Sequence, residues 1–173
     1  MKNSVKRSTG TLLLLLLVAG CSGASVAPGA STGAAMVEPN TGGGSFTAKS
    51  LGSDTFSDCA GSASGHFKFS GTGHASYLHR VTESGTMKGK VYPPHCVWSG
   101  TATLTSRRRV QDSVTFSLGL NGSRYHSPCN SAVGYVIKRG TGKFAKASGY
   151  GTVTFTCVSS GAYFDEWSGT LNF

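Results

Sequence analysis

Short runs of alternating hydrophobic and polar residues dominate the chain after about residue 46. In the clearest run, Val114, Phe116, Leu118 and Leu120 alternate with small or hydroxylated residues. A period of two places one face of a β-strand against a core and the other against solvent. The chain has no evident helical period, and the runs are rich in β-branched and aromatic residues, as strands are. Eight strands are predicted, at residues 66–69, 75–81, 87–92, 97–105, 110–120, 133–138, 151–158 and 167–173.

Gly, Asn, Pro and Ser separate these runs, so the connections are expected to be short turns. The spacing predicts an all-β domain, either an antiparallel eight-stranded barrel or, as the alternative, a β-sandwich. Gly71 and Gly73 suggest a turn between the first two strands. A glycine at every second position also removes side chains from one face, as tight curvature or a close approach of neighbouring backbones requires.

The C-terminal part of the chain carries a family resemblance. The stretch GTGKFAKASGYG at residues 140–151, the Thr-rich strands after it and the closing WSGTL at residues 167–171 resemble the last hairpins of allene oxide cyclase and dirigent β-barrels. The resemblance implies a small antiparallel barrel. No catalytic or substrate-guiding residue of those families has a match here, so none is carried over.

The first 20 residues have the pattern of a signal peptide. Lys2, Lys6 and Arg7 precede an apolar run at residues 12–17, which is too short to be a permanent membrane span. The sequence Val18-Ala19-Gly20-Cys21 then resembles the lipobox of bacterial lipoproteins. This resemblance implies that Cys21 becomes the mature N-terminus, carries fatty acids such as palmitate and anchors the chain in a membrane.

The same resemblance places the protein in the cell envelope. Residue 22 is Ser and not Asp, which favours the outer membrane over the inner one, or the outer face of the plasma membrane in an organism with a single membrane. Residues 21–45 contain few large apolar residues and read as a disordered linker rich in Gly, Ser, Ala and Pro. Residues 46–173 are expected to form the β-domain.

The cysteine count agrees with this division. Five cysteines are present, and lipidation of Cys21 leaves Cys59, Cys96, Cys129 and Cys157 for two disulfides in an exported chain. Zinc is the rival use of four thiols, but the four are widely spaced and include no CxxC pair. For strands that run up and down in order, we expect Cys96 to pair with Cys129, and Cys59 with Cys157.

The charge balance favours anionic partners. The formal net charge is +9, and removal of Lys2, Lys6 and Arg7 with the signal peptide leaves +6. Such a chain is drawn to anionic lipid headgroups, anionic envelope polymers or acidic proteins, whereas nucleic acid is not expected in that compartment. The strongest cluster is Arg107, Arg108 and Arg109 at a predicted hairpin turn, where solvated charges are the simpler interpretation. A second turn carries Lys138, Arg139, Lys143 and Lys146, and up-and-down strand order would join both turns in one basic rim.

Catalytic and metal-binding patterns are scarce in the sequence. His74 and His79 would face opposite sides of one continuous strand, His95 and His126 lie in Pro-flanked loops, and only seven acids are present, so no metal site or cofactor is expected. There is no GxSxG motif, and the neighbours Asp165 and Glu166 would point apart on a strand.

These observations favour a non-enzymatic role. The leading hypothesis is an envelope interaction or structural module with a basic rim. The second is a barrel whose aromatic residues line a cavity for a small apolar ligand instead of filling the core. The third is a cyclase-like enzyme, which a buried carboxylate in an open pocket would favour.

Overall fold

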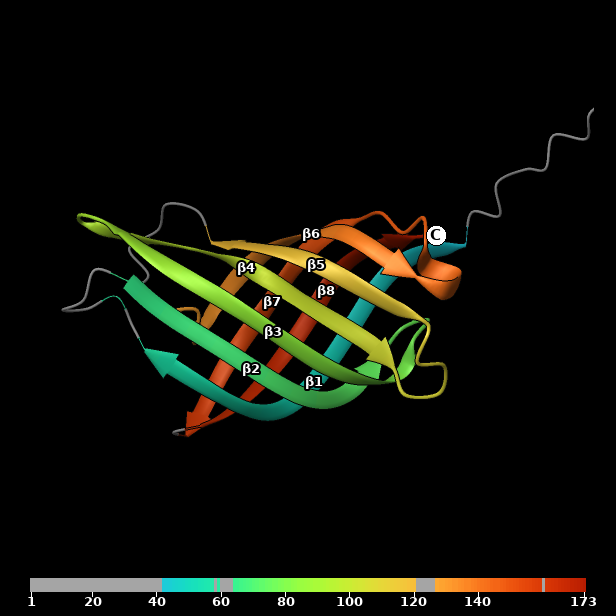
Figure 1. The fold of residues 1–173 in the computed structure, drawn as a ribbon, viewed down its shortest axis with the longest axis horizontal. Coiled ribbons are helices and arrows are strands. Elements are labelled where there is room, and N and C mark those ends of the chain that lie inside the picture. The colour runs from blue at the N-terminus through green and yellow to red at the C-terminus, as the bar shows by residue number, and fades with distance from the viewer. Residues whose placement is uncertain (1–41, 58, 60–63, 121–126, 160) are drawn as a thin grey trace, which may run out of the picture. The chain divides into compact units, whose positions relative to one another are not determined.

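The computed structural model describes residues 42–57, 59, 64–120, 127–159 and 161–173 (Figure 1). Within these ranges the chain forms eight strands and one short 3-10 helix, η1. Their bounds are β1 Gly43–Ser57, β2 Ser64–Ala75, β3 His79–Tyr92, β4 His95–Ser106, β5 Ser113–Leu120, β6 Ser131–Thr141, η1 Gly142–Phe144, β7 Tyr150–Ser159 and β8 Ala162–Asn172.

The strands close into an up-and-down antiparallel barrel. Each strand pairs with the next one in the sequence, and β8 returns to pair with β1. Ala48 shows the closure, since it lies opposite Ala75 of β2 on one side and Trp167 of β8 on the other. The predicted eight-stranded barrel is therefore confirmed, and the sandwich alternative is excluded.

Two of the predicted strand assignments were wrong, although the number of strands was right. The strand expected at residues 75–81 contains the hairpin turn between β2 and β3, and β3 then continues through the strand expected at 87–92. The missing eighth strand is β1, and its first residues, 43–45, belong to the segment expected to be linker. Its inward positions include Ala48, Ser50 and Asp54, which are too small or too polar to give a hydrophobic alternation.

The turn expected at Gly71 to Gly73 was also wrong, because β2 runs straight through it. A Cβ atom on Gly73 would lie 2.0 Å from the carbonyl oxygen of Lys49, and one on Gly71 would lie 2.7 Å from that of Leu51. These glycines therefore allow β1 and β2 to approach closely in a curved part of the wall.

Aromatic rings fill the interior in two groups. Phe46, Phe116, Tyr135 and Trp167 contact one another at centroid distances of 4.7–6.5 Å. A second group, which is centred on Phe155, is built from rings of β2, β7 and β8. It consists of Phe67, Phe69, Phe155 and Tyr163, with Trp98 buried beyond it.

All four cysteines of the barrel lie at one end, which we call the disulfide end. They form the bonds Cys59–Cys96 and Cys129–Cys157, so the expected pairs Cys96–Cys129 and Cys59–Cys157 were wrong. The register explains the second bond, since Ser131 lies opposite Phe155 and the same ladder extended by two residues brings Cys129 opposite Cys157. Cys96 and Cys129, in contrast, belong to β4 and to the approach to β6, with β5 between them.

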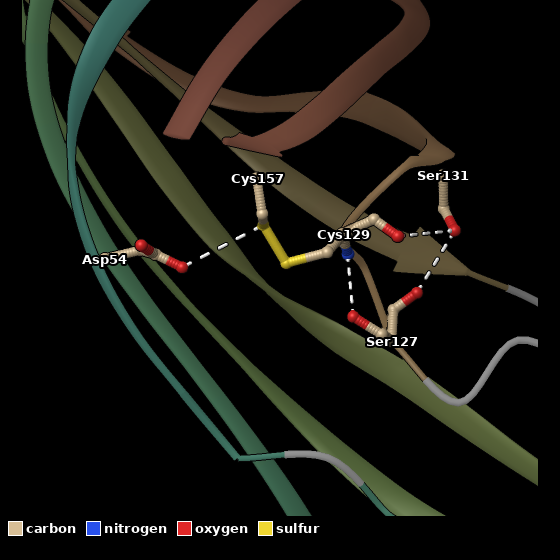
Figure 2. Close-up of a disulfide and its surroundings, with 5 residues drawn as sticks. All are labelled: Asp54, Ser127, Cys129, Ser131 and Cys157. Atoms are coloured by element: carbon tan, nitrogen blue, oxygen red, sulfur yellow. Dashed lines mark hydrogen bonds between the residues drawn. A yellow bond between two sulfur atoms is a disulfide. The ribbon is translucent and has the colours of Figure 1, made fainter. Parts of the chain in front are cut away.

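The Cys129–Cys157 bond is held in a local network (Figure 2). The backbone N–H of Cys129 donates to Oγ of Ser127 over 2.9 Å, and the hydroxyl of Ser131 donates to the carbonyl oxygens of Ser127 and Cys129. Oδ2 of Asp54 lies 3.9 Å from Sγ of Cys157. Because both sulfur atoms are in the disulfide, this cluster of potential metal ligands offers only a carboxylate.

Candidate functional site

Three strand connections gather at the end of the barrel opposite the disulfides, which we call the basic end (Figure 1). They are residues 76–78 between β2 and β3, residues 107–112 between β4 and β5, and residues 142–149 between β6 and β7. The first residue of β1 and the last residue of β8 lie at the same end. The predicted hairpin turn at Arg107 to Arg109 is thus confirmed, and up-and-down order places it beside the turn after β6.

Hydrogen bonds join the first two connections. The backbone N–H of Arg107 donates to the carbonyl oxygen of Arg80 over 2.8 Å, and the hydroxyl of Ser106 donates to the carbonyl oxygen of Leu78 over 3.1 Å. Arg107 is therefore fixed through its backbone, while its side chain remains exposed.

The third connection is joined to the others through Asp112 and Lys143. A carboxylate oxygen of Asp112 accepts the backbone N–H of Lys143 over 3.1 Å, and Nζ of Lys143 donates to the carbonyl oxygen of Tyr77 over 2.9 Å. Gly142 has a φ of 58°, and a Cβ atom there would strike Oδ1 of Asp112. Glycine at this position therefore permits the contact between the two loops.

Apolar side chains close this end of the barrel. Leu78 and Phe144 are fully buried, and Phe173 packs edge-on against Phe144 and Tyr77 at 4.7 and 5.4 Å between ring centroids. Nζ of Lys143 lies over the rings of Phe144 and Phe173 at 4.7 and 5.3 Å. The basic end is thus a packed, cross-linked platform and not a set of separate loops.

A cavity of about 540 Å³ opens on this platform, lined by His74, His79, Arg80, Arg107 and Arg108. Every one of these side chains is basic. Guanidinium groups can bind phosphate or carboxylate in bidentate fashion, and imidazole can add a hydrogen bond or, when protonated, a further positive charge. The side chains that line this cavity therefore carry groups that can bind an anion.

The β2–β3 hairpin explains how two of these residues come together. His74 lies opposite Arg80 in the register, and Ala75 lies opposite His79, which ends the turn with a φ of 60°. The expectation that His74 and His79 face opposite sides of one strand was wrong, because the chain reverses between them. A predicted turn at residues 76–78 would have brought His74, His79 and Arg80 into one group.

A second cavity of about 180 Å³ adjoins the first, and both are lined by His79 and Arg108. Arg109 and Lys143 also line it, so it extends the basic surface towards the β6–β7 connection. Its acid, Asp112, is buried and accepts the Lys143 N–H.

The predicted contact residues fall into two sets. Arg107, Arg108, Arg109 and Lys143 line these cavities, whereas Lys138, Arg139 and Lys146 are exposed near the same end and line neither one. The sequence analysis missed His74, His79 and Arg80. Of the remaining histidines, His66 and His95 lie towards the disulfide end, and His126 falls outside the described residues.

Four of the five acids among the described residues are hidden from the surface. Asp54, Glu83, Asp112 and Asp165 are all buried. Among the described residues only Glu166 presents an exposed carboxylate, and it forms an ion pair with Lys49 at 2.6 Å. The outer surface is therefore more strongly basic than the composition of the chain suggests.

Two of the buried acids form a polar group inside the barrel. Glu83 of β3 accepts a hydrogen bond from the Tyr163 hydroxyl over 3.1 Å, and Asp165 of β8 accepts one from the backbone N–H of Ser50 over 3.0 Å. Burial raises the pKa of Asp165 to about 9, with a further contribution from the neighbouring Glu83. Burial also raises the pKa of Glu83, which contacts with Asp165, Ser50, Tyr163 and Trp167 partly offset.

Asp165 therefore retains its proton at neutral pH, because ionisation would place charge in an environment that solvates it poorly. Trp167 of the first aromatic group and Tyr163 of the second both contact this pair of carboxyl groups. The two basic cavities lie outside this interior and do not include it. The geometry fits an internal polar contact between strands better than a reaction site.

No protein-family model, no curated protein and no solved structure matches the chain. In the part of the chain that the structure describes, no helix is long and apolar enough to cross a membrane.

Proposed function

We propose that this protein is a lipid-anchored module of the bacterial cell envelope that has no catalytic activity and binds anionic groups at its basic end. The lipobox-like sequence at Cys21 supports the anchor, since the other four cysteines are paired in disulfides. The observation that carries the proposal is the cavity lined by two histidines and three arginines, with no acid among the lining residues.

The chemistry of this cavity selects ligands with phosphate or carboxylate groups. Three guanidinium groups on a fixed backbone can bind several anionic oxygens at once, which favours a polyanion over a single small ion. Within the envelope, such groups are carried by lipid headgroups, surface polymers and acidic proteins. The rings that fill the interior favour this role over binding of an apolar ligand inside the barrel.

A binding measurement tests the anion site. In the mature chain carrying Cys21→Ser, the triple variant Arg80→Ser, Arg107→Ser, Arg108→Ser is expected to bind polyphosphate more than tenfold more weakly, because it loses three charge-assisted contacts. Calorimetric titration at several salt concentrations measures the affinity and its salt dependence.

A variant at the other end of the barrel provides the control. Lys68→Ser, Lys88→Ser, Lys90→Ser removes the same amount of charge from exposed strand positions and should change the affinity much less. Equal losses in the two variants would show that only net charge matters and would overturn the assigned site.

The anchor is tested separately by Cys21→Ala in the full chain. Loss of the acylated thiol should move the protein from the membrane fraction to the aqueous fraction, as detected by fractionation and immunoblotting. Retention in the membrane fraction after a high-salt wash would contradict the lipid anchor.

A further inference from the structure

We propose that the barrel stands end-on over the membrane that holds its own anchor, with the basic end facing the anionic phospholipid headgroups. This inference rests on the proposed function and names the partner of the same surface. It follows from three observations: where the chain enters the barrel, how the charges are divided between its ends, and what the tip of the β4–β5 connection exposes.

The chain enters the barrel at the basic end. Gly42 accepts a hydrogen bond from the backbone N–H of Phe173 over 2.8 Å, and β1 begins at the next residue. Phe173 in turn packs on Phe144 of η1, so the entry point belongs to the same platform as the basic cavities. The segment that runs back to Cys21 therefore joins the barrel beside the anion-binding surface and not at the disulfide end.

The segment between Cys21 and the barrel is short enough to limit how far the barrel lies from the anchor. Twenty residues separate Cys21 from Gly42, and a flexible chain of that length has a root-mean-square span of about 25 Å. Tilted strands of 11 or 12 residues give a barrel length on the order of 30 Å. An anchored chain thus holds the basic end within reach of the headgroups, whereas the disulfide end lies a full barrel length farther from the point of attachment.

The basic side chains are also more numerous at the end where the chain enters the barrel. Among the described residues, eight basic residues lie on or near the platform, whereas Lys68, Lys88 and Lys90 lie towards the disulfide end. The eight are Arg80, Arg107, Arg108, Arg109, Lys138, Arg139, Lys143 and Lys146. Each exposed basic residue near an anionic bilayer contributes roughly a fivefold increase in binding. The uneven distribution therefore orients the barrel as well as attracting it.

The tip of the β4–β5 connection adds an apolar contact. Val110 follows the three arginines and is 76% exposed. A basic cluster next to an exposed aliphatic side chain suits a membrane surface, where the charges meet phosphates and the side chain enters the interface. A dissolved polymer would use the arginines but gains little from Val110.

Orientation can be measured on the anchored chain. The mature chain is coupled through the Cys21 thiol to a maleimide lipid in nanodiscs that contain phosphatidylglycerol and a lipid with a paramagnetic headgroup. Amide NMR signals of residues 107–112 and 142–149 should broaden strongly, while those of Lys88, Lys90 and His95 should remain sharp. Nanodiscs of phosphatidylcholine alone, or high salt, should reduce the difference between the two ends to the part that the anchor alone imposes.

Two variants sharpen the test. Arg107→Ser, Arg108→Ser, Val110→Ser should weaken the end-selective broadening to the level seen with phosphatidylcholine alone, and Lys88→Ser, Lys90→Ser should preserve it. Uniform broadening, or stronger broadening at the disulfide end, would overturn the end-on orientation. Polyphosphate titration of the same samples separates the two proposals: polyphosphate binding without end-selective broadening refutes the orientation alone, and loss of both refutes the anion site as well.

Discussion

The polar group formed by Glu83 and Asp165 is an unusual occupant of a core that is otherwise built from rings. Both carboxyl groups are buried, and Glu83 accepts a hydrogen bond from Tyr163 while Asp165 accepts one from the backbone of Ser50. Burial raises both pKa values, because the barrel interior solvates a carboxylate poorly. The folded protein therefore binds protons that the unfolded chain releases.

This difference makes stability depend on pH. In the unfolded chain the two acids ionise near pH 4, whereas in the folded barrel Asp165 keeps its proton up to about pH 9. The free energy of unfolding should therefore be largest below about pH 4, as far as this pair is concerned, and should fall as the pH rises towards 9. The slope is about 1.4 kcal/mol per pH unit for one retained proton. Urea unfolding at a series of pH values measures it.

Substitutions at two neighbouring residues test whether the buried carboxyl pair causes this pH dependence. Asp165→Asn keeps an acceptor for the Ser50 N–H but cannot ionise. The slope should therefore become shallower by the contribution of one proton, about 1.4 kcal/mol per pH unit. Glu166→Gln changes the next residue, which is exposed, and should leave the slope nearly unchanged. The explanation would be wrong if both variants showed the wild-type pH dependence.

The sequence contained a signal for these residues. Asp165 and Glu166 were expected to point apart, and one is buried while the other is exposed. The same alternation places Glu83 between Val81 and Met87 on an inward face. Neither residue was predicted to be buried, because a period of two shows which residues share a face but not which distant carboxyl group lies opposite.

At the scale of the strands, glycine placement decides how the rings fit. A Cβ atom on Gly85 would lie 2.2 Å from Cζ of Phe69, a fully buried ring. Gly119 of β5, in contrast, has no atom within 4 Å of its Cβ position. The two glycines therefore serve different purposes, although both sit in alternating strand segments.

A pair of alanine substitutions should reveal this difference. Gly85→Ala is expected to lower the free energy of unfolding by about 1–3 kcal/mol, because Phe69 or the backbone must shift to admit the methyl group. Gly119→Ala should be neutral or raise stability by about 0.5 kcal/mol, because alanine loses less backbone entropy on folding. Denaturant unfolding of both variants makes the comparison, and equal effects would contradict the packing argument.

The predicted elements succeeded where side chains alternate strongly and failed where they do not. β5 alternates apolar and small residues throughout and was found with nearly its observed bounds. β1 was missed because its inward residues are small or polar, and Gly71 and Gly73 were read as a turn because close backbone approach leaves no hydrophobic pattern. Only the pairing of β1 with β2 shows why those positions are glycine.

For the molecule as a whole, the disulfides act on the unfolded chain. Their sequence separations of 37 and 28 residues are similar, so the loop-entropy relation assigns each about 3.5–4 kcal/mol of stability. The expected pairs of the sequence analysis would have closed loops of different lengths. The topology alone placed the cysteines at one end, and only the register of β6 with β7 selected their partners.

The double variants Cys59→Ala, Cys96→Ala and Cys129→Ala, Cys157→Ala should therefore be destabilised to a similar extent, each by about 3–4 kcal/mol. Denaturant unfolding without reductant gives the values, and peptide mapping of each variant confirms that the remaining bond is intact. A loss below about 1 kcal/mol in either variant would show that its loop is already constrained in the unfolded chain.

The basic platform likewise depends on the whole fold. The sequence indicated a rim from Arg107 to Arg109 and from the turn after β6, and both lie at one end because the strands run up and down in order. It did not indicate His74, His79 and Arg80, since their approach requires the reversal at residues 76–78. Nor did it show that four of the five acids among the described residues are buried, so that most exposed basic side chains have no acidic partner.

The seam between β1 and β8 has a consequence for how the chain is made. Its paired residues, such as Gly43 with Asn172 and Ser53 with Ala162, lie more than a hundred positions apart. Closure must wait until the last strand has been synthesised, and contacts of such high sequence separation form slowly. Until then β1 has an unpaired edge and the ring-filled interior is open. A nascent chain of this design therefore stays incompletely folded until β8 is available to pair with β1.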